Sequence, residues 1–147
     1  MADNGKIASE KFISGYNCAQ SVLFAFADKT GVDENTLLKI ATGLGAGMGR
    51  KQEVCGAVTG GILALSMLYG RGESEGSNAT ESTYIKTREF MEKFSEKHGS
   101  VLCSKLLDGC VLGSPEGQAR FKACDMKNKI CVPCVRDAAE IVAKIIG

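Results

Sequence analysis

Seven cysteines are the residues of this 147-residue chain that are best suited to chemistry. A thiolate is a nucleophile, a soft metal ligand and one half of a disulfide, so cysteines support either metal binding or thiol redox chemistry. The chain has a single histidine, His98, which excludes a zinc hydrolase that needs two or three imidazoles. We expect His98 to be a helix cap or a core residue. The chemistry is therefore expected to depend on cysteines and not on an acid–base residue.

Cys131 and Cys134 enclose a C-x-P-C motif, the single C-x-x-C pair of the sequence. In thioredoxin-like enzymes such a pair supplies an activated thiol and a second thiol that resolves the mixed disulfide. The βαβ pattern that surrounds the motif in those enzymes is missing here. The same spacing could supply two metal ligands, although a four-thiolate zinc site normally contains two such pairs. No C-x-x-C-H sequence is present, which rules out covalent attachment of a c-type haem.

The cysteines differ in how strongly their predicted positions favour a thiolate. Cys55 and Cys131 are each expected at the N-terminus of a helix, where unpaired backbone N–H groups and the helix dipole stabilise the thiolate. Cys18 is expected within a helix and Cys103 in a helical turn. Cys124 is expected to be a small hydrophobic residue of the core. Two of the best-placed nucleophiles or ligands thus come from distant parts of the chain.

Helices are predicted to position these cysteines, because apolar residues recur at helical spacing and no segment shows convincing strand alternation. We predict an all-α fold, with residues 1–147 forming one domain that is a bundle of five to six helices. Segment 55–69 is apolar nearly all round, which predicts the buried central helix. Asp33 and Asn78 are the expected N-caps of two other helices. The main helices are expected at 17–29, 33–42, 55–69, 78–99, from Ser114-Pro115 onward and from about 132 to the end, with a shorter helix near Asn4 and a helical turn at 103–107.

Two groups of glycines are expected near Cys55. Segment 43–49 (GLGAGMG) should break regular structure and pass tightly beside the central helix. An anion-binding nest with Arg50 and Lys51 is the alternative for this loop, but the glycine spacing is neither a dinucleotide-binding nor a phosphate-binding fingerprint. Gly56 and Gly60 form a small-xxx-small face that would bring neighbouring backbone near the Cys55 sulfur, which makes them candidates for binding a cofactor.

Three segments carry a resemblance to a known family. They are CGAVTG at 55–60, which is a full C-G-A-x-x-G motif, GYNCAQ at 15–20 and VRDAAE at 135–140. Together they resemble the family that is described as redox-active and named for its C-G-A-x-x-G motif and four characteristic cysteines. The resemblance extends from about residue 15 to the C-terminus and implies a largely helical fold. It places the four family cysteines on Cys18, Cys55, Cys103 and Cys131.

The same resemblance separates the remaining cysteines from these four. Cys134 falls on a position that is often not cysteine in relatives, and Cys110 and Cys124 are additions without an assigned role. A related helical module is joined to haem-binding segments in split-Soret-type cytochromes, where an iron–sulfur centre accompanies the haem. The resemblance therefore favours a cluster in this chain, without the haem.

Two mechanisms remain open for a site at which these thiols converge. In the first, the thiolates of Cys18, Cys55, Cys103 and Cys131 hold an iron–sulfur cluster or another soft metal, and the protein moves single electrons. In the second, no metal is bound and paired thiols cycle between dithiol and disulfide. Cys134 would be an alternative ligand or a resolving thiol. The rival function is a non-catalytic one, either a structural-zinc domain or a module that binds a metal or a small molecule, so the sequence does not decide whether the protein is an oxidoreductase, an electron-transfer protein or no enzyme.

Charge and hydropathy exclude several partners. The net charge of +1 offers no broad attraction to nucleic acid or to an anionic membrane. Residues 1–11 lack the apolar core of a secretory signal, and the longest apolar stretch, 62–69, is far shorter than the about 20 residues that span a bilayer. We therefore expect a cytoplasmic protein of bacterial type, in which a high cysteine count indicates metal binding or thiol chemistry. It would have an unidentified redox partner and could pair as a homodimer.

Overall fold

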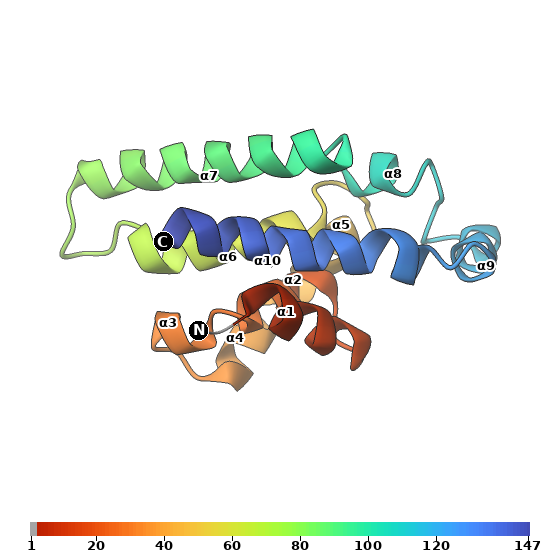
Figure 1. Ribbon diagram of the computed structural model, residues 1–147, viewed down its shortest axis with the longest axis horizontal. Helices are drawn as coiled ribbons and strands as arrows, with labels where there is room; N and C mark the ends of the chain where they lie inside the picture. Colours follow the sequence, from red (N-terminus) through yellow and green to blue (C-terminus); the bar gives the residue numbers. More distant parts are fainter. Residues whose placement is uncertain (1–2) are drawn as a thin grey trace.

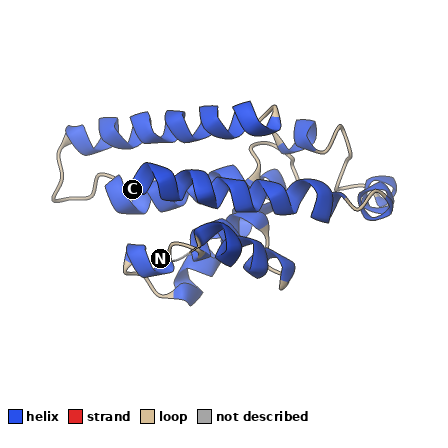
Figure 2. Ribbon diagram, in the orientation of Figure 1, coloured by secondary structure: helices blue, strands red, loops and turns tan. Residues whose placement is uncertain are grey.

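The computed structural model describes residues 3–147, and the regular structure of this part is helical (Figure 2). No strand forms among these residues, where the β-type contact is an isolated antiparallel bridge between Val54 and Leu102. The prediction of an all-α fold is confirmed. The prediction of five to six helices is too low, because residues 3–147 form the α-helices α1 to α10. Three of these, α3, α5 and α8, are single turns of four residues. Helix α8 corresponds to the predicted helical turn at 103–107, whereas α3 and α5 are too short for periodicity to reveal.

The elements follow one another with short connections. Their bounds are α1 (Asn4–Ile13), α2 (Cys18–Phe24), α3 (Ala27–Thr30), α4 (Glu34–Ala41), the 3-10 helix η1 (Thr42–Leu44), α5 (Gly45–Met48), α6 (Gly56–Tyr69), α7 (Ser77–His98), α8 (Cys103–Leu106), α9 (Pro115–Ala123), the π-helix η2 (Lys127–Cys131) and α10 (Val132–Ile146).

The helices are arranged in three layers (Figure 1). The long helix α7 lies on one side, α6 and α10 lie in the middle, and α1 to α4 cover the other side. Helix α10 packs against α1, α6 and α7, and α2 packs against α6. The helices α6 and α10 begin at the end of the bundle where α7 finishes, and α8 and α9 follow at that end. We call this the cavity end, because a cavity lined by cysteines lies there.

The main core lies between the layers and is made by the regular helices. Phe26, Leu65, Phe90, Phe94 and Val142 are fully buried there. Helix α6 is apolar nearly all round because it is covered by α2, α7 and α10, which confirms its prediction as the central helix. This core provides the rigid frame from which the cysteines extend.

Several helix boundaries match their sequence signals and two do not. The Asp33 carboxylate accepts from the Thr36 N–H, and Ser114 caps α9 with Pro115 at its first turn, as predicted. The predicted helix 17–29 is interrupted, because Phe26 leaves helical geometry (φ −111°, ψ 15°) with its ring fully buried. Asn78 is not an N-cap: Gly76 takes that place in an extended conformation and α7 already begins at Ser77.

The predicted break at 43–49 is confirmed and has an unusual backbone. Positive φ angles occur at Ala46, Met48, Arg50 and Gln52 as well as at the glycines between them. A left-handed conformation is costly for residues that carry a Cβ, so this segment is strained. Separately, none of the helices in residues 3–147 has the length and apolar character that crossing a membrane requires.

Candidate functional site

Five of the seven cysteines line one cavity at the cavity end of the bundle. The cavity has a volume of about 150 Å³, which suits a molecule about the size of benzene. The cysteines are Cys18, Cys55, Cys103, Cys131 and Cys134. These are all the cysteines that the sequence singles out, although they come from four separate parts of the chain. The rest of the wall is mainly apolar, with side chains that include Phe12, Leu106, Leu107, Leu112, Phe121 and Ile130.

The bridge between Val54 and Leu102 brings Cys55 and Cys103 to the cavity together. The Cys55 N–H donates to the Val101 carbonyl, and the Cys103 N–H donates to the Glu53 carbonyl, both at 2.7 Å. Cys55 then caps α6, and Cys103 begins α8. Two backbone segments that are almost fifty residues apart in sequence are thereby fixed side by side.

Cys18 reaches the same cavity because the N-terminus of α2 approaches that of α6. Asn17 caps α2 in a reciprocal capping box with Gln20 and also donates to the Thr42 carbonyl. Gly56 lies directly against the Cys18 sulfur, where a Cβ would overlap it. Gly60 packs in the same way on the Ala19 backbone. Gly56 lines the cavity, and the sulfur against which it packs is that of Cys18. Gly60 instead allows the close contact between α2 and α6.

Cys131 and Cys134 enter the cavity from the junction of η2 and α10. Pro133 has no N–H to donate to the carbonyl one turn earlier, and the helix widens to π geometry immediately before it. The Val132 N–H accordingly donates to the Lys127 carbonyl. Cys131 has helical angles itself (φ −69°, ψ −44°), so it is not at the open end of a helix. The expectation that Cys131 is activated by a free helix N-terminus is wrong for this reason.

Cys55 is the thiol that its surroundings activate. A hydrogen bond from the Cys134 thiol and the backbone N–H groups of Ala57 and Val58 lower the pKa of Cys55, although burial opposes them. This agrees with the predicted effect of the N-terminus of α6. The same contact raises the pKa of Cys134, because the proton that it gives to the hydrogen bond must stay on its sulfur; burial adds to the effect.

The other three thiols of the cavity are held protonated. Burial, followed by the nearby Cys55, raises the pKa of Cys18 to about 11, in spite of the Ala46 and Ala19 N–H groups. Burial also raises the pKa of Cys103 to about 12. Burial and the neighbouring cysteines raise the pKa of Cys131 as well. The cavity therefore contains one readily ionised thiol among four reluctant ones.

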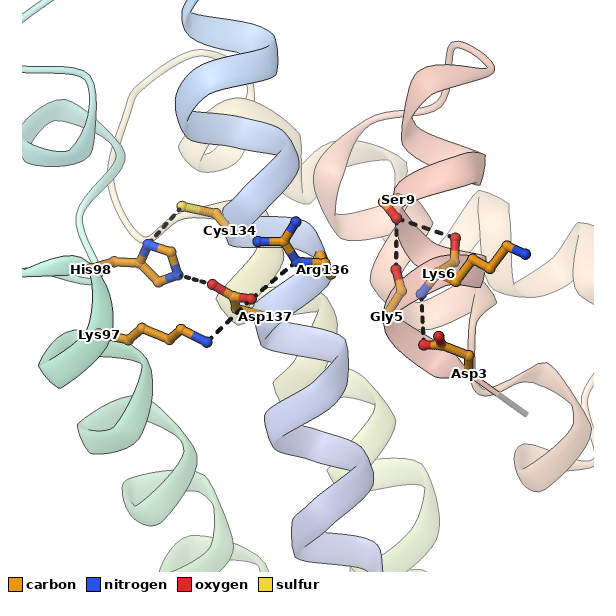
Figure 3. Close-up of polar contacts among 9 residues, drawn as sticks. All are labelled: Asp3, Gly5, Lys6, Ser9, Lys97, His98, Cys134, Arg136 and Asp137. Atoms are coloured by element: carbon orange, nitrogen blue, oxygen red, sulfur yellow. Dashed lines mark hydrogen bonds and ion pairs between the residues drawn. The ribbon is translucent and has the colours of Figure 1, made fainter. Parts of the chain in front are cut away.

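A histidine and an aspartate, which the sequence analysis did not assign to the site, adjoin this group (Figure 3). His98 Nδ1 lies 3.8 Å from the Cys134 sulfur, and His98 Nε2 lies 2.9 Å from Asp137 Oδ2. His98 is the last residue of α7, and Asp137 lies one helical turn after Cys134 on α10. The sequence contains only a weak signal for this role of Asp137. It is an aspartate on the buried stripe of an amphipathic helix, three residues after Cys134.

The two remaining cysteines lie outside the cavity wall. Cys110 is buried, and its thiol donates to the Gly117 carbonyl at 3.1 Å. Cys124 is exposed at the end of α9, so its prediction as a core residue is wrong. The helix α9 is largely polar and lies at the edge of the bundle, and Cys124 follows it at the exposed C-terminal cap.

The thiols as arranged do not fit a metal ion directly. Within residues 3–147, no three side chains of His, Cys, Asp or Glu are grouped so that they could hold one ion. Without an ion, burial raises the pKa of Cys18, Cys103 and Cys131, so these three thiols are neutral. We therefore derive no step through a metal. The metal site expected from Cys18, Cys55, Cys103 and Cys131 stays a prediction.

Comparison with known families gives a match over nearly the whole chain. The profile of the family described as "Putative redox-active protein (C_GCAxxG_C_C)" matches residues 16–145, which is nearly the whole chain and includes every cysteine. No curated protein and no solved structure shows significant similarity to the chain. The sequence-based resemblance to this family is confirmed.

Proposed function

The chain belongs to this family of proteins described as redox-active, and we propose that it works by reversible dithiol–disulfide exchange between Cys55 and Cys134. The observation that carries the proposal is that both cysteines line one cavity at the N-terminus of α6, where Cys134 is the largest cause of the lowered pKa of Cys55. The pKa of Cys55 is lowered, and the pKa of Cys134 is raised. This is the asymmetry that a nucleophilic thiol and its resolving partner need.

The reaction consumes a disulfide and moves two electrons. The Cys55 thiolate attacks one sulfur of a disulfide RS–SR′, so that the S–S bond of the substrate breaks and a Cys55–S–SR bond forms. The released R′S⁻ takes up a proton. Cys134 then attacks the Cys55 sulfur, which forms the Cys55–Cys134 disulfide and releases RS⁻ to be protonated in turn. The substrate is reduced to two thiols, and the two protein thiols are oxidised.

The wall of the cavity favours a small and uncharged substrate. Its apolar side chains exclude water around the two reacting sulfurs, and a charged group would lose its hydration there without a counter-charge. The neutral thiols of Cys18, Cys103 and Cys131 complete the wall. Return to the dithiol form requires a thiol reductant, which fits a cytoplasmic protein, because that compartment keeps thiols reduced.

The proposed redox pair differs from the pair of cysteines that the sequence motif indicates. The C-x-P-C motif favours Cys131 and Cys134 as the couple, whereas the hydrogen bond and the lowered pKa favour Cys55 and Cys134. A metal or iron–sulfur centre and a structural-zinc or ligand-binding module are the alternative functions. Both alternatives can be separated from thiol exchange by the metal content of the protein and by the number of thiols that it loses on oxidation.

Anaerobic purification, metal analysis and a redox titration with glutathione test the proposal. We expect metal-free protein that loses two thiols together at one midpoint potential. The Cys55→Ser and Cys134→Ser variants should lose this transition, and Cys124→Ser, which changes an exposed cysteine outside the cavity, should keep it. Iron with acid-labile sulfide would overturn the proposal in favour of electron transfer by a cluster. Tightly bound zinc without any thiol transition would overturn it in favour of a structural role.

A further inference from the structure

A line of three side chains connects the thiol pair to a buried carboxylate (Figure 3). Cys134 contacts His98 Nδ1 at 3.8 Å, and His98 Nε2 contacts Asp137 Oδ2 at 2.9 Å. The Asp137 side chain is only 4% exposed and that of His98 only 15%. Three residues from two helices thus form a continuous polar path, which ends on a reacting sulfur.

The carboxylate determines which nitrogen of His98 faces the thiol as an acceptor. An ionised aspartate only accepts hydrogen bonds, so His98 Nε2 must carry the hydrogen that it donates to Asp137 Oδ2. In neutral His98, the other nitrogen, Nδ1, then presents its lone pair to the Cys134 sulfur. After it accepts a proton, the same nitrogen donates to a thiolate. Both states of the imidazole therefore fit the geometry.

The surroundings of His98 hold it in this orientation. Its ring lies against Phe94, with the ring centres 4.7 Å apart. Around Asp137, Lys97 Nζ lies 3.4 Å and Arg136 Nε 3.3 Å from Oδ1, so Oδ2 is left to the histidine. The charged and titratable groups around this unit include Lys97 on α7 and Arg136 on α10, which face Asp137. Cys134 faces His98, and Cys55 and Cys131 act on Cys134.

Resolution of a mixed disulfide requires a base that takes the proton of Cys134, and His98 is placed to be that base. Cys134 keeps its proton in the resting site because it donates to Cys55 and is buried. Once Cys55 is joined to a substrate sulfur, Cys134 must become a thiolate in order to attack, and little water reaches it. A base in contact with that sulfur lowers the barrier to its deprotonation.

We propose that His98, oriented by Asp137, is the base that takes the proton of Cys134 and so allows Cys134 to resolve the mixed disulfide on Cys55. The inference rests on the dithiol function proposed above. In the step, the S–H bond of Cys134 breaks and an N–H bond forms at His98 Nδ1. The Cys134 thiolate then forms the new S–S bond as the Cys55–SR bond breaks, and the imidazolium gives its proton to the departing RS⁻. His98 returns to its neutral form, and Asp137 acts only as a positioning residue.

A single-turnover experiment with the neutral disulfide dithiodipyridine tests this step. With protein in excess, attack by Cys55 releases the first thiopyridone in a phase that depends on protein concentration. Resolution by Cys134 releases the second in a phase that does not. In the Cys124→Ser background, we expect His98→Gln to slow the second phase by about 100-fold at neutral pH, which is the typical contribution of a general base, while the first phase is unchanged. Asp137→Asn should slow the second phase to a smaller extent.

The dependence on pH and on added base separates proton transfer from a merely structural role. In the wild-type protein, the second phase should reach a plateau as the pH rises, because an internal base takes the proton of Cys134. In His98→Gln it should rise continuously with pH, because hydroxide must then deprotonate Cys134. Added imidazole should accelerate the second phase of His98→Ala and leave Cys134→Ser without one. The wild-type pH profile and circular dichroism of each variant keep the test valid if a substitution disturbs folding.

The outcomes distinguish this inference from the function on which it rests. Wild-type protein that shows both phases, together with a folded His98→Gln whose second phase is as fast, would overturn the role of His98 alone. A wild-type second phase that rises without a plateau would do the same. Wild-type protein without a concentration-independent second phase would overturn the Cys55–Cys134 exchange itself.

Discussion

The main core and the cavity end of this bundle are built in different ways. The core between α2, α6, α7 and α10 consists of regular helices, and its large side chains such as Phe90 and Leu65 are fully buried. At the cavity end, the backbone contains a left-handed segment, a π-helix and an isolated bridge. Every thiol of the proposed site lies there. Irregular backbone is thus concentrated where reactive side chains meet, which is a common property of functional sites.

Truncation of one leucine in each region should give the largest difference. Leu65 and Leu107 are both buried, but Leu107 lines the cavity and Leu65 lies in the packed core. Leu→Ala in a core costs about 2–5 kcal/mol, and the cost depends on the void that remains. We expect Leu65→Ala to lower the free energy of unfolding by an amount near the top of this range. Leu107→Ala should fall near the bottom, because part of its surface already faces empty space.

Urea denaturation of the two variants measures this difference directly. The same samples can be tested for exchange with a small disulfide. Leu107→Ala should alter the rate and Leu65→Ala should not, as long as the protein remains folded. Equal losses of stability would show that the cavity end is packed as tightly as the core and would contradict the comparison.

Gly56 offers the next largest effect, because it joins the regular and irregular regions. A Cβ at this position would overlap the Cys18 sulfur, and overpacking of this kind costs about 1–3 kcal/mol. We expect Gly56→Ala to be destabilised by this amount in thermal or chemical unfolding. The matched control is Gly43→Ala, where no atom lies within 4 Å of the added Cβ. A Gly56→Ala variant as stable as Gly43→Ala would show that α2 and α6 are not in such close contact.

Alkaline pH should weaken the cavity end through Cys18. The pKa of Cys18 is raised from 9.0 to about 11 in the folded protein, by burial and by Cys55. The unfolded chain releases this proton first as the pH rises, so the stability contributed by the neutral thiol is complete below pH 9 and is lost by about pH 11. The melting temperature of the wild-type protein should therefore fall more steeply across this window than that of Cys18→Ser. Parallel curves would contradict the raised pKa.

The smallest effect is expected at Cys124. Its thiol is exposed and lies outside the cavity, and substitutions at such surface positions usually change stability by less than about 0.5 kcal/mol. Cys124→Ser should keep the stability, the thiol transition and the exchange kinetics of the wild-type protein. A loss of exchange in this variant would place part of the redox chemistry on α9.

Much of the frame could be predicted from the sequence, because its signals are local. The apolar run at 55–69 predicts the central helix, and it also predicts Cys55 at the N-terminus of that helix. Asp33 and the Ser114-Pro115 pair mark helix starts correctly. Side-chain hydrogen bonds and proline geometry act within a few residues, so that neighbouring letters of the sequence are sufficient.

The parts that could not be predicted depend on contacts between distant segments. The bridge between Val54 and Leu102 places Cys55 beside Cys103, and no local sequence pattern predicts this bridge. His98 was expected to be a cap or a core residue, yet it meets Cys134 and Asp137 through the packing of α7 on α10. The left-handed segment and the π-helix likewise depend on the surrounding structure. The homodimer stays a prediction.

The most direct test of this account is to identify the disulfide that forms first. Reduced, metal-free protein would be treated anaerobically with one equivalent of dithiodipyridine, blocked with an alkylating reagent, digested and analysed by mass spectrometry. The account predicts a peptide pair that joins Cys55 to Cys134. A bond between Cys131 and Cys134, as the C-x-P-C motif alone suggests, or a mixed disulfide on Cys55 that Cys134 never resolves, would contradict it.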